Sequence, residues 1–256
     1  MAESGLFSIL DSVDSTNNYA MAIVHEALAR HGMAWFAHEQ TAGKGQRGKK
    51  WQTGKGQNIA LSIVLEPTGL KIQEQFKISV AVSLACFDFL KGLCTEEIFI
   101  KWPNDIYMRD RKAGGILIEN LIQGNNWKYA VAGIGININQ TVFDKEANNP
   151  TSLKNITDKN YNTVELAKSL YEKVMLRIID LKKKSFADLL KEYNSHLYKL
   201  NTSVKLKKET VIFETMIRGV SKEGKLLTTD IIDNEFDFGE VEWVASPLTP
   251  RQKTGE

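Results

Sequence analysis

Cysteine and proline are scarce in this chain, which has two cysteines and five prolines among 256 residues. Cys86 and Cys94 do not form a Cys-X-X-Cys pair, which argues against a disulfide scaffold and against a structural zinc site. Both cysteines lie in an apolar segment with helical spacing, where a cysteine is usually a buried free thiol. We therefore expect a protein of the reducing cytoplasm.

Long apolar runs and an excess of one charge are also absent. No stretch approaches the roughly 20 apolar residues that a membrane-spanning helix requires, and residues 1–5 lack the basic and apolar parts of a signal peptide. The 33 basic and 31 acidic residues leave a net charge of +2, which gives no reason to expect a nucleic-acid binder. The four histidines have no metal-ligand spacing and no Gly-X-Ser-X-Gly motif accompanies them, which argues against a zinc enzyme and a serine hydrolase.

The chain does contain a regular series of apolar patterns. A period of two predicts strands, and a period near 3.6 predicts helices. Helices are expected over about 15–30, 72–93 and 164–200, and strands over 33–39, 58–65, 98–102, 105–108, 112–122 and 127–139. After residue 201 short strands are expected over 204–206, 211–220, 225–229 and 237–244, as in a small β-barrel. The expected organisation is a main α+β domain over 1–200, a small barrel over 201–246 and a polar tail over 247–256.

The strongest local anomaly is the segment from Thr41 to Gly56. It contains five glycines and five cations, and no acidic residue occurs between Glu39 and Glu66. The run Gly43–Gly48 matches Gly-X-Gly-X-X-Gly, but a strand rather than a helix follows it, so we reject a dinucleotide-binding fold. Two interpretations remain: a cationic glycine-rich loop that closes on an anion, or a solvated basic loop.

A second unusual stretch begins at Gly133. Isoleucines occupy one face of this predicted strand, and Gly133, Gly135, Asn137 and Asn139 occupy the other. Glycine contributes no side chain to packing. Either a flat ligand lies against this backbone while an amide reads its polar edge, or another strand or a helix makes a close contact here.

Polar residues also follow the short strand at 98–102. Pro103 disfavours helix for the preceding Lys101 and Trp102. Asn104 and Asp105 therefore fall at a turn. The aspartate either helps to hold a hydrated Mg²⁺ or bonds the backbone of its own turn.

Lys112 opens the next predicted strand and is followed by three small residues, Ala113, Gly114 and Gly115. The lysine either reaches into a cleft that the small residues leave open, or protects a strand edge. Only the first arrangement gives it a role in binding an anion.

Taken together, these segments resemble the biotin–protein ligase family. The matching segments are Asp14–Asn17, Gln40–Trp51, Lys101–Asp105, Arg111–Leu117 and Gly133–Asn137. Their order and spacing agree, and the resemblance extends over about residues 8–245. It implies an α+β fold: a mixed sheet with flanking helices, like the catalytic domain of class II aminoacyl-tRNA synthetases, followed by a small SH3-like barrel.

The resemblance also implies a two-step ligase reaction. Biotin and ATP, with Mg²⁺, first give biotinyl-5′-AMP and diphosphate, and a lysine of a biotin carboxyl carrier protein then takes the biotin. The cationic loop suits this chemistry, because two anions ~4 Å apart repel by about 1 kcal/mol in water and by about 4 kcal/mol at an intermediate dielectric. Fixed cations counter this repulsion, and a loop that covers the adenylate shields it from water.

By position, the resemblance assigns a role to each matching residue. The catalytic residues would be Lys112, Lys44, Arg47 and Asp105. Biotin binding would involve Ser15, Thr16, Asn17, Gln40, Gly43, Lys44, Gly45, Gln46, Lys112, Gly114 and Gly115. ATP binding would involve Arg47, Lys49, Trp51, Asn104, Lys112 and Asn137, with Trp51 near the adenine and Asn137 at its edge. Asn104 and Asp105 would orient either Mg²⁺ or the acceptor lysine.

The loop departs from the family pattern at two positions. Many members have arginine where Gln46 stands, and glutamine keeps a donor but removes a permanent charge. We therefore expect this loop to retain the adenylate less tightly. Lys44 replaces another arginine, which keeps the charge but loses the bidentate geometry.

The resemblance also bears on partners. Some family members carry an N-terminal helix-turn-helix that represses transcription, but too few residues precede Ser15 for three helices. We therefore expect no DNA binding, and no membrane partner. A monomer and a homodimer both remain open.

Two rival functions remain in view. A lipoate or octanoyl protein transferase would share the architecture, but octanoyl transferases of this type need a nucleophilic cysteine, whereas Cys86 and Cys94 lie in an apolar helical segment. A nucleic-acid-binding module would use the basic loop with Trp51, but it leaves the glycine and asparagine face over 133–139 unexplained.

Overall fold

The computed structural model describes residues 5–144, 147 and 149–244. The chain divides into two compact units, Met1–Tyr198 and Lys199–Glu256. The polar tail that the sequence predicts over 247–256 lies outside the described residues. Within the described part of the chain, no helix is both long and apolar enough to cross a membrane.

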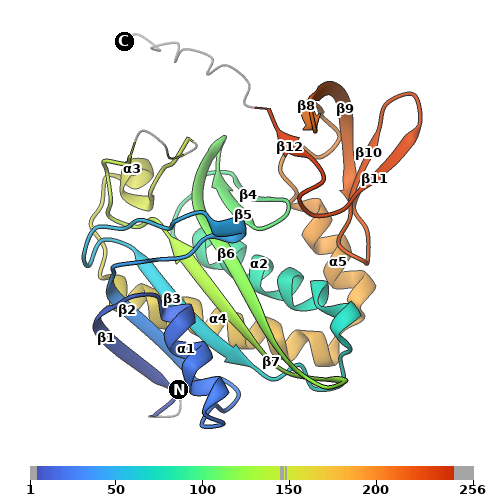
Figure 1. Cartoon of the computed structure of the whole chain (residues 1–256). Helices are drawn as coiled ribbons and strands as arrows, with labels where there is room; N and C mark the ends of the chain where they lie inside the picture. The colour runs from blue at the N-terminus through green and yellow to red at the C-terminus, as the bar shows by residue number, and fades with distance from the viewer. Residues whose placement is uncertain (1–4, 145–146, 148, 245–256) are drawn as a thin grey trace, which may run out of the picture. The chain divides into compact units, whose positions relative to one another are not determined.

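A seven-stranded mixed sheet forms the centre of the first unit (Figure 1). In spatial order its strands are β1 (Phe7–Val13), β2 (Ala34–Gln40), β3 (Ile59–Leu65), β7 (Asn126–Ile136), β6 (Arg111–Gln123), β5 (Asp105–Met108) and β4 (Ile98–Lys101). β1 and β2 pair in parallel, and the other neighbouring strands of this sheet pair antiparallel.

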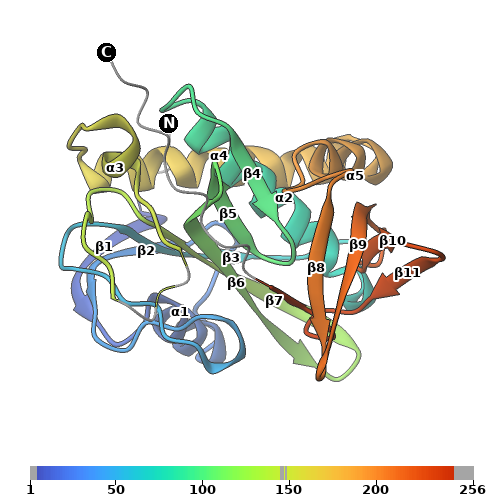
Figure 2. The same cartoon turned by 90° about the horizontal axis from the view of Figure 1, so that it is seen from above.

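Helices cover both faces of this sheet. α1 (Thr16–His25) lies on one face, and α2 (Phe76–Lys91) and α4 (Thr163–Lys183) lie on the other (Figure 2). Both α1 and α4 contact β3, and all seven residues of β3 are buried. A strand that is covered on both faces is expected to be a continuous apolar run, and β3 has this pattern apart from Ser62. The predicted mixed sheet with flanking helices is confirmed.

The single helix predicted over 164–200 is wrong, because this segment forms α4 and a separate helix, α5 (Phe186–Ser195). Lys184 has an extended backbone, with φ −107° and ψ 157°. The Ser185 side chain then accepts a hydrogen bond from Ala187 N at the start of α5. Serine favours such a cap over a place inside a helix, so the apolar spacing continues across a break that the serine creates.

Other boundaries also differ from the prediction. α1 ends at His25 rather than near residue 30, and the segment 72–93 is a 3₁₀ turn (Ile72–Glu74) followed by α2. β7 ends at Ile136, so residues 137–139 lie beyond the strand. The sequence pattern did not predict β1, which lies at the sheet edge, or the short α3 (Leu153–Thr157).

The second unit contains a five-stranded antiparallel sheet. Its strands, in spatial order, are β11 (Asp233–Phe236), β10 (Leu226–Thr229), β9 (Val211–Val220), β8 (Ser203–Lys208) and β12 (Glu242–Trp243). The side chains buried in this unit include Leu206, Ile217, Val220, Leu226 and Phe236. The predicted change to short strands is confirmed, but the strand expected over 237–244 is wrong. Residues 233–236 pair with β10, and only 242–243 pair with β8.

Arg177 joins three helices of the first unit. Its guanidinium donates to Asp88 on α2 at 2.7 and 2.9 Å and to Glu192 on α5 at 3.0 and 2.6 Å. Burial alone would lower the pKa of Arg177, but these bonds raise it above its ordinary value. We expect Arg177→Ala to lower the free energy of unfolding by about 1–3 kcal/mol, because two carboxylates then lose their shared partner. Urea unfolding measures this against Lys173→Ala, an exposed lysine of α4; equal midpoints would contradict the expectation.

Two histidines should make the protein less stable in acid. Burial lowers the pKa of His31, whose Nδ1 accepts a hydrogen bond from Glu66 N at 3.1 Å. Burial also lowers the pKa of His196, which stacks on Phe87. A histidine with a lowered pKa in the folded chain binds its proton more readily in the unfolded chain. The contribution of the neutral histidines to the free energy of unfolding is therefore fully present above the ordinary histidine pKa of about 6.5. It is lost as the pH falls below that value.

Urea unfolding between about pH 8 and pH 5 measures this effect. Replacing both residues, as His31→Gln with His196→Gln, should make the free energy of unfolding less dependent on pH over this range. A pH dependence as steep as that of the unmodified protein would show that other groups cause it.

Candidate active site

The N-terminus of α1 forms a buried polar cluster with β2 and β3. Gln40 Oε1 accepts a hydrogen bond from Thr16 N at 2.8 Å and lies 3.1 Å from Thr16 Oγ1. Ser62 Oγ lies 2.7 Å from Thr16 Oγ1 and 2.6 Å from Asn17 Oδ1. Ser15, the N-cap residue of α1, is buried beside them. The structure therefore brings together four of the residues that the resemblance assigns to biotin, and adds Ser62.

Asn17 lies over Gly133 of β7. A Cβ atom at Gly133 would come closer than 3.0 Å to the Asn17 side chain, so glycine leaves room for the amide. Asn17 Nδ2 donates to Leu117 O at 3.3 Å and to Glu119 Oε2 at 2.8 Å, both on β6. The amide is thereby held from both sides.

The Trp51 indole lies over Gly135 as Asn17 lies over Gly133. A Cβ at Gly135 would come closer than 3.0 Å to the Trp51 indole. The indole Nε1 is buried and has no hydrogen-bond partner among the described residues. The interpretation in which a flat ligand lies on these two glycines is therefore wrong. The flat group at Gly135 is the protein's own indole, from a segment that is neither strand nor helix. The alternative of a close strand–helix contact is confirmed at Gly133, where Asn17 of α1 lies.

The glycine-rich segment is folded as a small hairpin. Trp51 N donates to Gly43 O at 2.9 Å, and Gln46–Gly48 forms a turn of 3₁₀ helix in which Arg47 has φ 55°. A Cβ at Gly43 would come closer than 3.0 Å to Trp51 O, so this glycine permits the two arms to approach. The exposed cations of the hairpin are Lys44, Arg47, Lys49 and Lys50.

Two of the predicted catalytic cations pair with carboxylates. Lys112 Nζ lies 2.6 Å from Asp105 Oδ1, and Lys44 Nζ lies 3.9 Å from Glu119 Oε1. The Lys112 side chain turns toward Gly115, since a Cβ there would lie 3.6 Å from its Nζ. Each cation therefore has an internal counter-ion that an anionic substrate would have to replace.

These groups share one face of β6 and β7. Gly115 is paired with Gly135, and Leu117 is paired with Gly133. Alternate residues of a strand face the same side, so Lys112, the Trp51 indole, Asn17 and Glu119 follow one another along this face. Gly115 and Glu119 are four residues apart, or about 13 Å along the strand. Lys112 and Lys44 thus stand toward opposite ends of the face.

The two asparagines assigned to ATP bond the protein's own backbone. Asn104 Nδ2 donates to Ile116 O at 2.9 Å, and Ile116 N donates to Asn104 O at 2.9 Å. Asn137 is buried, and its Nδ2 donates to Thr151 O at 2.9 Å. The role of Asn137 at an adenine edge stays a prediction.

Sequence reasoning missed Ser62 and Glu119. Ser62 is the one polar residue in β3, a strand buried along its whole length, and a buried hydroxyl usually has a hydrogen-bond partner. That pattern could have identified it. Glu119 lies in the second half of β6, beyond the matching segment, and its importance comes only from contacts with residues distant in sequence.

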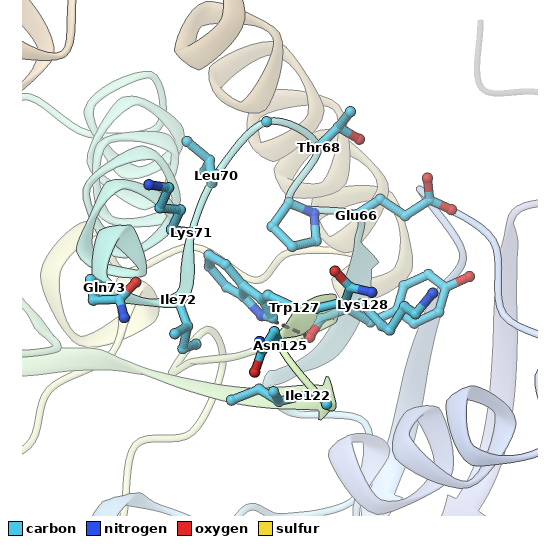
Figure 3. Close-up of a pocket in the computed structure, with 15 residues that line it drawn as sticks. Glu66, Thr68, Leu70, Lys71, Ile72, Gln73, Ile122, Asn125, Trp127 and Lys128 are labelled. Carbon is cyan, nitrogen blue, oxygen red and sulfur yellow. Dashed lines mark hydrogen bonds between the residues drawn. The ribbon is translucent and has the colours of Figure 1, made fainter.

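One cavity of the described residues lies away from these groups. It has a volume of about 850 Å³ and is lined by residues 66–73 and by residues 122 and 124–129 (Figure 3). Trp127 lies at its centre and donates from Nε1 to Tyr129 O at 3.0 Å. These residues follow β3 and connect β6 to β7, so the cavity is at the opposite end of the strands from Lys112 and Gly135. It does not contain the predicted site residues.

A metal centre held by the protein alone would need several ligand side chains in one group. Among the described residues, no three His, Cys, Asp or Glu side chains are grouped so as to hold a metal ion. Asp105 is a carboxylate at the predicted place, but it is paired with Lys112. This arrangement suits an ion that arrives with a phosphate ligand better than one held by the protein alone.

Comparisons of the sequence with known proteins agree on one family. Residues 9–137 match the model of the biotin/lipoate A/B protein ligase family. The chain is 35% identical over 138 residues to the bifunctional ligase/repressor BirA of Salmonella typhimurium. The matched region covers 53% of this chain and 42% of that protein. It is 36% identical over 133 residues to the biotin--[acetyl-CoA-carboxylase] ligase of Paracoccus denitrificans, covering 51% of this chain and 53% of that protein. The chain thus spans about half the length of these curated relatives.

A solved structure agrees over nearly the whole chain. The biotin protein ligase from Aquifex aeolicus in complex with biotin and ATP superposes with a TM-score of 0.79 at 27% identity. The match covers 94% of this chain and 100% of that one. The sheet, its helices and the second antiparallel sheet are therefore those of a known fold, and the chain belongs to the biotin/lipoate A/B protein ligase family.

Proposed function

We propose that this protein is a biotin–protein ligase, which activates biotin with ATP and transfers it to a lysine of a biotin carboxyl carrier protein. The observation that carries the proposal is a set of polar and cationic side chains around β6 and β7. It combines a polar cluster, in which Thr16 and Asn17 are buried and Gln40 is half-buried, with a cation, Lys112, and a cationic hairpin. The cluster suits the polar ureido ring of biotin, and the cations suit its carboxylate and the phosphates of ATP.

In the first step, a biotin carboxylate oxygen attacks the α-phosphorus of ATP. The bond from that phosphorus to the bridging oxygen breaks, and diphosphate leaves. Lys112 would leave Asp105 to bind the two approaching anions, and Arg47 and Lys49 of the hairpin would neutralise the phosphates. Closure of the hairpin would exclude water from the mixed anhydride.

In the second step, the neutral amine of the acceptor lysine attacks the acyl carbon. The bond to AMP breaks, and the new amide nitrogen loses a proton. Asp105, once relieved of Lys112, would be free either to receive the ammonium group or to take its proton.

Mg²⁺ belongs to this proposal as the ion bound to ATP. Asp105 would supply one carboxylate, which fits an ion coordinated mainly by phosphate oxygens and water. When bound, the ion would withdraw charge from the phosphates. The free thiols Cys86 and Cys94 are the basis for proposing a cytoplasmic setting.

The direct test combines the protein, ATP, Mg²⁺ and a biotin carboxyl carrier domain. Biotin should cause release of diphosphate and add one biotin to the carrier, as measured by intact mass. Omission of ATP is the control. If lipoate replaces biotin with equal or greater efficiency, the lipoate ligase alternative is favoured and the proposal is wrong.

Gln46 provides a prediction about the intermediate. Arginine at this position would add a charge beside the phosphate, so Gln46→Arg should slow release of biotinyl-AMP by about two- to five-fold, the range for a partly exposed charge pair. Release is measured by trapping free adenylate after a single turnover, with Gln52→Arg in the same segment as the control. Equal rates of biotinyl-AMP release from the Gln46 variant and the unmodified protein would contradict this prediction.

A further inference from the structure

Glu119 is a carboxylate to which the proposed two-step reaction gives no role. Its side chain is 32% exposed, and its two oxygens have different partners. Oε2 accepts from Asn17 Nδ2 at 2.8 Å, and Oε1 lies 3.9 Å from Lys44 Nζ. Asn17 belongs to the buried polar cluster and Lys44 to the glycine-rich hairpin. Glu119 therefore links the polar cluster to the glycine-rich hairpin that would cover the site.

The carboxylate also orients the Asn17 amide, together with Leu117 O. An ionised carboxylate and a carbonyl oxygen only accept, so Asn17 presents Nδ2 to both of them and Oδ1 to Ser62. Ser62 Oγ donates to Asn17 Oδ1 at 2.6 Å and to Thr16 Oγ1 at 2.7 Å, so its one proton is shared between these two oxygens. Thr16 Oγ1 in turn donates to Gln40 Oε1 at 3.1 Å, because an amide oxygen only accepts. Glu119 therefore helps to decide that Asn17 faces the hydroxyl network with an acceptor.

The cluster contains acceptors as well as donors. Gln40 Oε1 accepts from both Thr16 N and Thr16 Oγ1, and Asn17 Oδ1 accepts from Ser62. The position of the Asn17 amide therefore affects the hydroxyl network that would meet a cyclic urea, which has two N–H donors and a carbonyl acceptor. We propose that Glu119 is a positioning residue that fixes the Asn17 amide within the proposed biotin-binding cluster and holds Lys44 beside it. The proposal rests on the proposed ligase function.

The substitution Glu119→Gln separates this role from simple packing, because glutamine has nearly the same shape. If its carbonyl faces Asn17, its amide faces Lys44, and two donors oppose each other. If its amide faces Asn17, the asparagine must turn over, and its oxygen then faces Leu117 O. The first orientation therefore loses the contact with Lys44, and the second loses the hydrogen bond from Asn17 to Leu117 O.

The experiment compares Glu119→Gln and Glu119→Asp with Glu172→Gln, which changes an exposed glutamate of α4. Diphosphate release gives KM for biotin and kcat. Limited trypsin digestion without ligand reports the hairpin, which offers cleavage sites after Lys44, Arg47, Lys49 and Lys50. Thermal melting identifies any variant that fails to fold.

Glu119→Gln should raise KM for biotin about ten-fold, as for loss of a hydrogen bond to a charged group, while kcat changes by less than about two-fold because no reacting atom is touched. Cleavage in the hairpin should accelerate about two- to five-fold, the effect of a partly exposed ion pair. Glu119→Asp keeps the charge and should show a smaller rise in KM. The Glu172 variant should match the unmodified protein.

A KM and a cleavage rate equal to those of the Glu172 control would overturn the proposal. So would an equal fall in kcat for Glu119→Gln with KM unchanged, since that result indicates a catalytic group. If Glu119→Gln does not fold, Glu119→Asp decides, and an unchanged KM and cleavage rate in that variant overturn the proposal. Absence of biotin-dependent diphosphate release from the unmodified protein would instead reject the ligase function, and the cleavage comparison would still decide whether Glu119 holds the hairpin.

Discussion

Lys112→Ala should lower the rate of biotin-dependent diphosphate release by at least about ten-fold, as expected when a preorganised charge is removed from the transition state. Lys112 is the cation that lies on the shared face of β6 and β7, 2.6 Å from Asp105. Without it, the biotin carboxylate and the α-phosphate would meet beside an unpaired carboxylate. The loss should therefore appear in kcat as well as in kcat/KM.

A defect in folding should not be the cause of this loss of activity in Lys112→Ala. The side chains of Lys112 and Asp105 are 29% and 22% exposed, so their ion pair contributes about 1 kcal/mol or less to stability. Lys128→Ala is the matched control, because Lys128 is an exposed lysine of the neighbouring strand β7. Diphosphate release from Lys112→Ala at the rate of the Lys128 variant would refute the role of Lys112.

Gly133→Ala should damage both stability and biotin binding. The new Cβ would come closer than 3.0 Å to the Asn17 side chain, and Asn17 cannot retreat without losing its bonds to Ser62 and Glu119. Overpacking of this kind costs about 1–3 kcal/mol. If Asn17 is displaced, KM for biotin should also rise by about ten-fold through loss of the ordered cluster.

Urea unfolding and steady-state kinetics measure the two effects. Gly92→Ala is the control, because a Cβ at Gly92 would have ordinary contacts, 3.5 Å from Asp88 O and Phe89 O. A Gly133→Ala protein with unchanged stability and unchanged KM would show that the cluster can shift freely.

The fold could be predicted from the sequence where one pattern dominates. β3 is apolar throughout, and β7 has isoleucines with a period of two. These strands and the helices beside them follow from apolar spacing. β1 was missed because an edge strand with partly exposed residues has no clear alternation. The break between α4 and α5 was missed because the apolar spacing continues past Ser185, and only the capping bond shows that a new helix begins.

The candidate site was predicted in its residues but not in its contacts. The motif segments located Thr16, Asn17, Gln40, Trp51 and Lys112, which the structure brings to the same end of the sheet. The sequence leaves two interpretations of the β7 glycines open, and only the structure shows that Gly133 and Gly135 make room for Asn17 and Trp51 rather than for a ligand. Which of two side chains fills a gap depends on tertiary register, and no local pattern of residues encodes it.

The contact between Asn17 and Gly133 joins residues that are far apart in the chain, and Glu119 lies between them in sequence. The polar cluster therefore cannot assemble until β7 is available to pair with both β3 and β6. During synthesis, the polar cluster would therefore form only after β7 had left the ribosome. Contacts between residues so far apart in the chain form only after the long loop between them has closed. Release of the chain before that point would leave α1 and the hairpin without the β7 glycines over which Asn17 and Trp51 lie.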